Sequence, residues 1–190
     1  SCMQIHTKLK LKDTKCKEGC PPVYWAAKGG KIENYRYLMK NLKDINPASN
    51  QGFTPLHLAA ANGHFDICKL IINNVDNKNP AIHNGTTPLF IAAQEGHFDI
   101  CKLLIDNVNE KNPANYDGFT PLYIAAARGH FEICKLIIDN VDNKNPAIFD
   151  GITPLYIAAQ KGHFDICKFI IDNVHEKNPA NNDGYTPLYV

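Results

Sequence analysis

The sequence predicts an all-α solenoid in which antiparallel helix pairs are linked by β-hairpin-like loops. Two observations predict it: a repeat of 33 residues that runs through most of the 190 residues, and two short apolar segments with helical spacing in each copy. A pair of short helices cannot bury its apolar faces alone, so successive copies must stack side by side around one continuous core. The expected organisation is one elongated domain.

The repeat is marked by the triplet Thr-Pro-Leu, which begins every 33 residues at Thr54, Thr87, Thr120, Thr153 and Thr186. A register one unit upstream aligns Pro22 with Pro55 and Gly30 with Gly63, which indicates a degenerate earlier copy. We therefore expect an N-terminal extension at 1–18, a degenerate capping repeat at 19–51, full repeats at 52–84, 85–117, 118–150 and 151–183, and the start of a further, truncated repeat at 184–190.

Each copy carries signals for two helices and a turn. A threonine before a proline starts a helix, because the hydroxyl can cap free amides and proline loses no hydrogen bond at the first helical position. The first helix should therefore begin at Thr54-Pro55 and stop near Gly63, which can take a positive φ. A second helix, with apolar positions from Phe65 to Ile72, should follow it. The Asn84-Gly85 step favours a tight hairpin turn, so the connecting loop should project as a β-like finger.

Composition and charge exclude several classes of partner. Lysine and arginine total 20 against 19 aspartate and glutamate, so no net field draws the chain to nucleic acid or anionic lipid. The apolar runs are too short for direct membrane insertion, and the first residues contain no apolar signal core. Seven cysteines, four of them at one interval in apolar segments, fit reduced core packing better than a disulfide framework. The expected location is intracellular, in the cytoplasm.

The segment GFTPLYIAAARGHFEICKLII at residues 118–138 closely resembles the ankyrin repeat. The resemblance covers roughly residues 19–190, and a 33-residue period with the pattern T-P-L-x-x-A-A-x-x-G-H is highly specific. It implies an ankyrin-repeat solenoid of L-shaped units, in which hairpin fingers project from stacked helix pairs. It also implies a concave surface that binds protein partners.

The sequence departs from the family's pattern at two places. The histidine that typically follows Thr-Pro-Leu is present as His57 and is replaced by Phe90, Tyr123, Tyr156 and Tyr189 in the later copies. This replacement puts hydrogen bonding between repeats through that side chain in question. The usual glycine after the second helix is also replaced, by valines such as Val75. We therefore expect the second helix to run longer, with Asn74 or Asn77 in its C-terminal turn, and a helix that ends before Asn73 would contradict this.

Recurring histidines and cysteines are the candidates for metal or redox chemistry. Stacked helices lie about 8 to 10 Å apart, too far for one metal ion to collect ligands from successive repeats. The histidine column is therefore expected to pack at the turn between the two helices, and it comprises His64, His97, His130 and His163. The same spacing exceeds the reach of a disulfide. The cysteine column is expected to fill the core, and it comprises Cys68, Cys101, Cys134 and Cys167.

Two further patterns bear on catalysis and cofactors. Cys16 and Cys20 are close enough to share an ion, but no second ligand pair lies nearby, so no metal site is expected. The sequence contains no glycine-rich phosphate loop and no recognisable arrangement of nucleophile, base and orienting acid. We therefore expect a chain that is not an enzyme and that holds no cofactor.

Positions that vary between copies are the candidates for partner binding, because packing does not dictate them. The first finger column contains His83, Tyr116 and Phe149, whose rings offer large rigid contact area. The alternative is that each ring packs on the adjacent finger. The second finger column contains Phe53, Thr86, Phe119 and Ile152. The helix-one face, concave in the family, contributes Gln94, Glu95, Arg128, Gln160 and Lys161. We expect the aromatic residues after Thr-Pro-Leu to be half-buried between repeats.

The leading hypothesis is a protein–protein interaction module, a non-catalytic scaffold or adaptor that binds another protein through the fingers and the concave helix-one face. The alternative is a structural tether or self-associating segment of a longer ankyrin array, of the cytoskeletal or channel-tail type. Because the last residues begin a further repeat, the stack should expose an apolar flank there. We expect a monomer, or weak self-association through that uncapped C-terminal end. A third alternative places an enzyme domain outside this segment.

Overall fold

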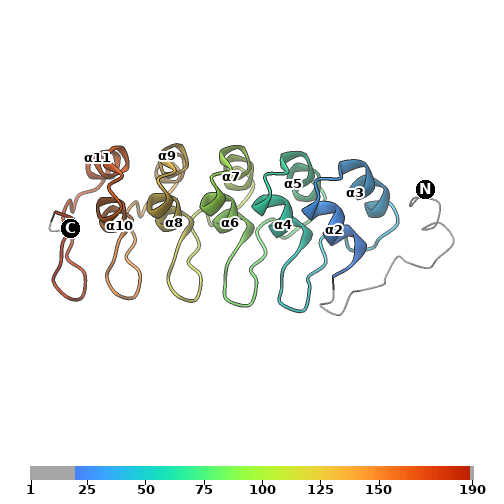
Figure 1. Cartoon of the computed structure of the whole chain (residues 1–190), viewed down its shortest axis with the longest axis horizontal. Coiled ribbons are helices and arrows are strands. Elements are labelled where there is room, and N and C mark those ends of the chain that lie inside the picture. The colour runs from blue at the N-terminus through green and yellow to red at the C-terminus, as the bar shows by residue number, and fades with distance from the viewer. Residues whose placement is uncertain (1–19, 189–190) are drawn as a thin grey trace.

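The computed structural model describes residues 20–188, and this part of the chain is an all-helical solenoid, as predicted. Its helices form five antiparallel pairs: α2 (Pro22–Lys28) with α3 (Ile32–Met39), α4 (Pro55–Ala61) with α5 (Phe65–Ile72), α6 (Pro88–Glu95) with α7 (Phe98–Ile105), α8 (Pro121–Arg128) with α9 (Phe131–Ile138), and α10 (Pro154–Gln160) with α11 (Phe164–Asn173). The first helices of the pairs form one layer and the second helices form another (Figure 1). The loops project beyond the first layer, away from the second.

Two hydrogen bonds hold the start of the first helix in the repeats that begin at Thr87, Thr120 and Thr153. The Thr87 hydroxyl accepts the backbone N–H of Phe90 at 3.3 Å, as a capping threonine should. The Asn79 side-chain carbonyl accepts the backbone N–H of Leu89 at 3.1 Å and thereby closes the base of the finger between them. The same closure recurs in Asn46–Leu56, Asn112–Leu122, Asn145–Leu155 and Asn178–Leu188. The predicted helix starts at Thr-Pro are confirmed.

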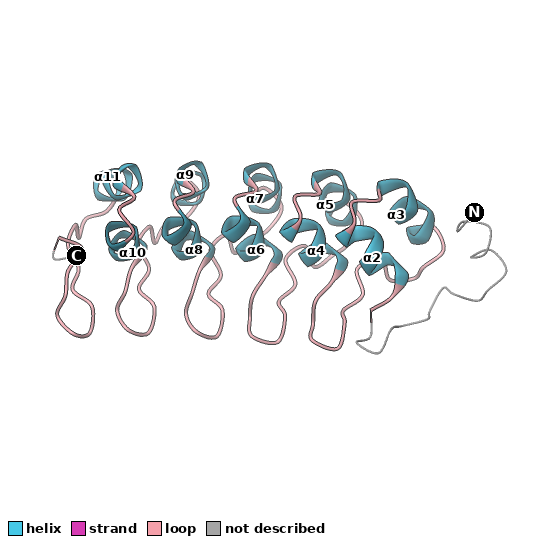
Figure 2. Cartoon of the chain, viewed as in Figure 1, coloured by secondary structure: helices cyan, strands magenta, loops and turns pink. Residues whose placement is uncertain are grey.

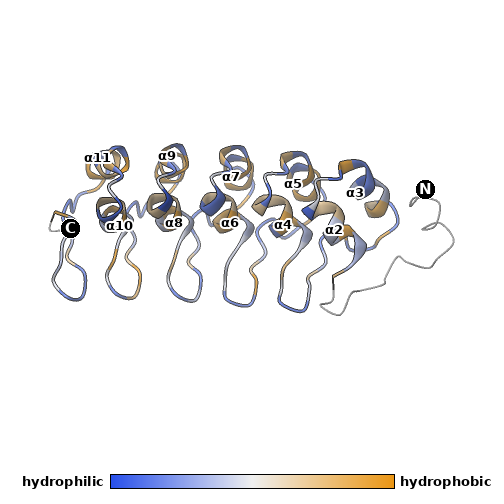
Figure 3. Ribbon diagram, in the orientation of Figure 1, coloured by the Kyte–Doolittle hydropathy of each residue, from blue (hydrophilic) through white to orange (hydrophobic). Residues whose placement is uncertain are grey.

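One continuous core runs between the two helical layers. The paired alanines of the first helices, such as Ala92 and Ala93, are fully buried and let neighbouring first helices approach closely. The second helices bury a recurrent set, represented in α7 by Ile100, Cys101 and Leu104. The cysteine column therefore fills core positions, although Cys167 in α11 is only half-buried. Figure 3 shows the apolar colouring on the faces that neighbouring helices share.

The prediction of a longer second helix is wrong for three of the repeats. Helices α5, α7 and α9 end at Ile72, Ile105 and Ile138, one residue before the asparagine or aspartate that caps them. Among the second helices of residues 20–188, α11 alone runs on, to Asn173. The Asn74 amide does serve the last turn of α5, because it donates to the Leu70 carbonyl oxygen at 2.8 Å. Asn173 makes the same bond to Phe169 in α11, which runs on, so this bond alone does not set where the helix ends.

The fingers have the hydrogen bonds of a hairpin without forming strands, and Figure 2 shows them as loops. In one of them, the Gly85 N–H donates to the Ile82 carbonyl oxygen and the Ile82 N–H donates to the Thr86 carbonyl oxygen, both at 2.9 Å. Gly85 has a φ of +85°, whereas Asn84, like the other described non-glycine residues, does not have a positive φ. The turn is therefore followed by a glycine bulge, and a two-residue type I′ turn is excluded.

The histidine column joins each repeat to the one before it. The His130 Nε2 lies 3.1 Å from the carbonyl oxygen of Gln94, 36 residues earlier. The equivalent distances for His64, His97 and His163 are 3.0, 3.3 and 3.4 Å. The His130 ring also covers Gly96, where an added Cβ would lie 2.7 Å from the ring Cε1. The predicted packing at the inter-helix turn is confirmed, and the structure adds that the contact crosses the repeat boundary.

His57 makes a second contact between repeats. Its Nδ1 accepts the Thr54 N–H at 3.1 Å, so the proton lies on Nε2, which is 3.4 Å from the Thr86 carbonyl oxygen of the next repeat. The side chain is fully buried. Burial lowers the pKa of His57 to about 4, although hydrogen bonds to the Thr86 and Pro80 carbonyls oppose the shift.

Aromatic side chains fill the position of His57 in the later repeats. Phe90 and Tyr156 are buried and Tyr123 is half-buried. The prediction of half-burial is therefore confirmed for Tyr123, and the other two are more deeply buried than expected. An aromatic ring without the imidazole nitrogens is thus compatible with this site in the stack.

The glycine beneath each histidine provides a matched test of the contact. Gly96 and Gly162 have similar positive φ values, +80° and +74°, but a Cβ at Gly162 would meet nothing within 4 Å. Gly162→Ala should lower the free energy of unfolding by about 1 kcal/mol, from backbone strain alone. Gly96→Ala should cost about 1 to 2 kcal/mol more, because the His130 ring must move and its hydrogen bond is lost. Urea unfolding followed by circular dichroism measures both, and equal losses would contradict the role of the histidine.

The buried imidazole of His57 should make stability depend on pH. The folded state keeps His57 neutral down to its pKa of about 4, whereas the unfolded chain binds a proton below its ordinary value of 6.5. Protonation of His57 in the unfolded chain therefore does not affect stability above pH 6.5. As the pH falls from 6.5 toward 4, it lowers the free energy of unfolding by about 3 kcal/mol in total. In His57→Phe, which copies Phe90, the free energy of unfolding should fall less steeply over this range. Parallel pH profiles of the two proteins would refute the assignment.

Candidate functional site

The first finger column lies at the outer ends of the fingers. Tyr116 and Phe149 are 72% and 73% exposed, and His83 is also exposed. The Tyr116 ring nevertheless touches the preceding finger: if Gly85 carried a Cβ, that atom would lie 3.0 Å from the Tyr116 Cδ1. The Tyr116 ring therefore rests on its neighbour and still exposes most of its surface to solvent, and the role of the column in partner binding stays a prediction.

The second finger column lies closer to the helices. Phe53, Phe119 and Ile152 are half-buried, and Thr86 is buried. The Phe119 ring packs on Tyr123, with ring centroids 5.0 Å apart. These side chains support the start of the first helix and leave a smaller surface for a partner than the first column does.

The helix-one face lies at the C-terminal ends of the first helices. Glu95, Arg128, Gln160 and Lys161 are exposed. Gln94 is half-buried, and its amide donates to the Glu95 carboxylate at 2.9 Å. The charge on this face changes sign along the stack, from Glu95 on α6 to Arg128 on α8 and Lys161 after α10.

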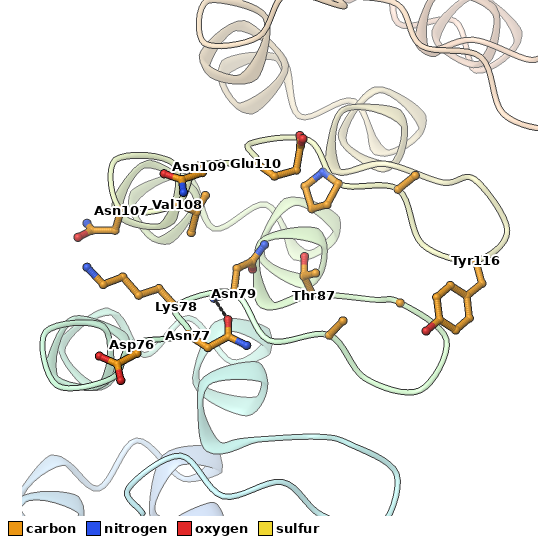
Figure 4. A pocket seen from close by; sticks show the side chains of 14 residues that line it. Asp76, Asn77, Lys78, Asn79, Thr87, Asn107, Val108, Asn109, Glu110 and Tyr116 are labelled. Carbon is orange, nitrogen blue, oxygen red and sulfur yellow. Dashed lines mark hydrogen bonds between the residues drawn. The ribbon is translucent and has the colours of Figure 1, made fainter.

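A polar cavity of about 470 Å³ separates the loop at 76–87 from the loop at 107–116. Figure 4 shows Asp76 and Lys78 at one end and Tyr116 at the other. Asparagine side chains line the space between them, and Asn77 accepts the Asn79 N–H at 3.2 Å. The cavity offers amide and charged groups of both signs and shares Tyr116 with the finger column.

Sequence reasoning missed exposed rings on the first helix pair. Trp25 on α2 is 48% exposed, and the Lys28 ammonium lies 5.4 Å from its ring centroid. Tyr37 on α3 is 54% exposed. Trp25 stands at the position that Leu58 and Ile91 occupy in later repeats. This replacement of an aliphatic residue by a larger aromatic one could have predicted an exposed ring.

The thiols and titratable groups show no arrangement for catalysis or metal binding in the part of the chain that is described. Burial raises the pKa of Cys68, Cys101 and Cys134 to about 12, so these thiols are poor nucleophiles at neutral pH. Residues 20–188 contain no group of three or more His, Cys, Asp or Glu side chains that could hold a metal ion. The expectation that Cys16 and Cys20 form no metal site is not tested, since Cys16 lies outside the described residues.

None of the helices between residues 20 and 188 has the length and apolar character needed to cross a bilayer.

Comparison with known proteins places this architecture in a family. A family model described as ankyrin repeats (3 copies) matches residues 2–81, 69–147 and 139–190. No curated protein matches the chain. Ankyrin repeats are generally protein–protein interaction modules that bind other proteins, and the family is typically non-catalytic. The repeat length, the stacked helix pairs and the matched segments agree, and the chain belongs to the ankyrin-repeat family.

Proposed function

We propose that this chain is a non-catalytic scaffold or adaptor segment that binds a protein partner through its fingers and helix-one face. The observation that carries the proposal is the exposure of Tyr116 and Phe149, at 72% and 73%, on neighbouring fingers. Large apolar rings exposed on one surface are typical of interaction sites, where they supply most of the binding energy. The partner would bury both rings.

The fingers are held in place before any partner binds. The Tyr116 N–H donates to the Asn84 carbonyl oxygen of the preceding finger at 2.9 Å. The Asn112 side chain closes the base of the same finger by accepting the Leu122 N–H at 2.8 Å. A surface that is already ordered loses less conformational entropy on binding, which favours affinity.

The helix-one face would supply specificity. Its exposed members differ in charge between repeats, with Glu95 on one repeat and Arg128 on the next. Exposed charges at the rim of an interface favour a matching partner and disfavour others. The repeat boundaries given above, from 52–84 to 151–183, define the proposed binding units, and an intracellular location stays a prediction.

The proposal is tested by the double substitution Tyr116→Ala with Phe149→Ala. Partner capture from a lysate of the source organism should be lost, because the main apolar contact is removed. The melting temperature should change by only about 1 to 2 °C, since both side chains are mostly exposed in the free protein.

Phe164→Ala is the matched control, because this ring is 75% exposed but lies on α11, away from the fingers. It should leave partner capture intact. Unchanged capture by the finger double variant, or a large loss of its stability, would refute the binding role.

Self-association is the second candidate function, and the exposed apolar surface of the last described repeat favours it. Phe164 and Leu188 are 75% and 80% exposed, whereas Phe65 and Phe98, which correspond to Phe164, are 37% and 38% exposed. Surface of this kind favours association with another apolar face.

Light scattering over a range of protein concentration tests this second function. Self-association should raise the mean mass with concentration, and Phe164→Glu should abolish the rise, because a carboxylate cannot be buried there without a partner. A constant monomer mass for the unchanged chain would exclude this function.

A further inference from the structure

The junction between the fingers of residues 116–117 and 149–150 differs from the other finger junctions of the described chain. His83, Tyr116 and Asn182 each donate a backbone N–H to a carbonyl oxygen of the preceding finger, at 3.5, 2.9 and 3.0 Å. Among residues 20–188, Phe149 makes no such bond to Asp117. The Phe149 N–H and the Asp117 carbonyl oxygen therefore do not bond each other.

The backbones are also further apart at this junction. A Cβ at Gly85 would lie 3.0 Å from its nearest atom on the next finger, and a Cβ at Gly118 would lie 3.4 Å from its nearest, the Ile148 Cα. The atoms nearest Gly118 belong to Ile148 and to the backbone of Phe149, so the Phe149 ring does not cover this glycine as Tyr116 covers Gly85. The two fingers are still in van der Waals contact here, and the Phe149 ring beside the junction is exposed.

Each of these two fingers carries a carboxylate next to its ring. Asp117 follows Tyr116, Asp150 follows Phe149, and both carboxylates are exposed. The ion pairs formed within residues 20–188 are Glu33 with Arg36 and Lys102 with Asp106, so neither fingertip carboxylate is neutralised by a pair. The preceding finger differs, because Asn84 stands in the position of Asp117.

The combination of ring and carboxylate selects a cation. The face of an aromatic ring attracts ammonium and guanidinium groups, and Lys28 already lies over Trp25 in this way elsewhere in the chain. A carboxylate adds a charge-assisted hydrogen bond to the same group.

We propose that the junction between the Tyr116-Asp117 and Phe149-Asp150 fingers binds a lysine or arginine side chain of the protein partner. This inference rests on the proposed function and names the chemistry of its ligand. The partner's cation lies against the exposed rings and the two carboxylates.

Selection from a phage-displayed library of random twelve-residue peptides on the full chain tests this. Selected peptides should share a lysine or arginine beside an apolar residue. Replacing that cation by norleucine in a synthetic peptide should weaken the dissociation constant about tenfold. Asp117→Asn with Asp150→Asn should weaken it by a similar factor, because the substitution removes the charges and keeps the shape.

The matched control is Glu132→Gln with Asp165→Asn, which removes two exposed charges from the second helices and should change affinity less than about twofold. Two results would overturn the inference and leave the proposed function standing. In both, Tyr116→Ala with Phe149→Ala abolishes peptide binding, but either the peptides contain no cation or they still bind the aspartate double variant. The inference would also be overturned if the peptides bound both double variants normally, or if the library gave no peptide whose binding depends on the fingers. Loss of partner capture by the ring variant would still support the proposed function in that case.

Discussion

Lateral packing between consecutive helix pairs is the constraint on which the rest of this structure depends. No pair has enough apolar surface of its own to fold alone, and the buried residues form one cluster that runs from Val23 to Ile170. Three kinds of contact repeat along the stack: close approach of alanines in the first helices, burial of isoleucines in the second, and the histidine that reaches a carbonyl of the preceding repeat. Each of these contacts joins two consecutive repeats. Loss of one contact should therefore weaken the interface between those two repeats most.

This packing also determines where function can reside. The residues that hold the repeats together are the ones that recur, so side chains free to differ lie on the fingers and at the ends of the first helices. The finger bases are closed by asparagine side chains, as in Asn112 to Leu122 at 2.8 Å, which fixes where each finger leaves the helices. Tyr116 and Phe149 can therefore differ from Asn50 and Asn182 without any change in the helices below them.

Much of the fold could be predicted because its signals are local. Thr-Pro marks the helix starts through capping chemistry that needs no neighbour, and the 33-residue interval requires stacking. The end of the second helix was missed because the Val75 column was taken as a sign of a longer helix, whereas α5, α7 and α9 are capped at Asn73, Asp106 and Asp139. The contact of His130 with Gln94 depends on the offset between stacked repeats, which no single repeat shows. The partner-binding residues were chosen from their variation between copies, and their role in binding stays a prediction.

The cysteine column gives the stack a graded susceptibility to oxidation. With a pKa of about 12, the thiols of Cys68, Cys101 and Cys134 are ionised to only about one part in ten thousand at pH 8, and they are also shielded from reagents. Cys167 occupies the same place in its helix but is half-buried, and its pKa is raised mainly by that partial burial. Peroxide or a disulfide reagent should therefore modify Cys167 before the other three thiols.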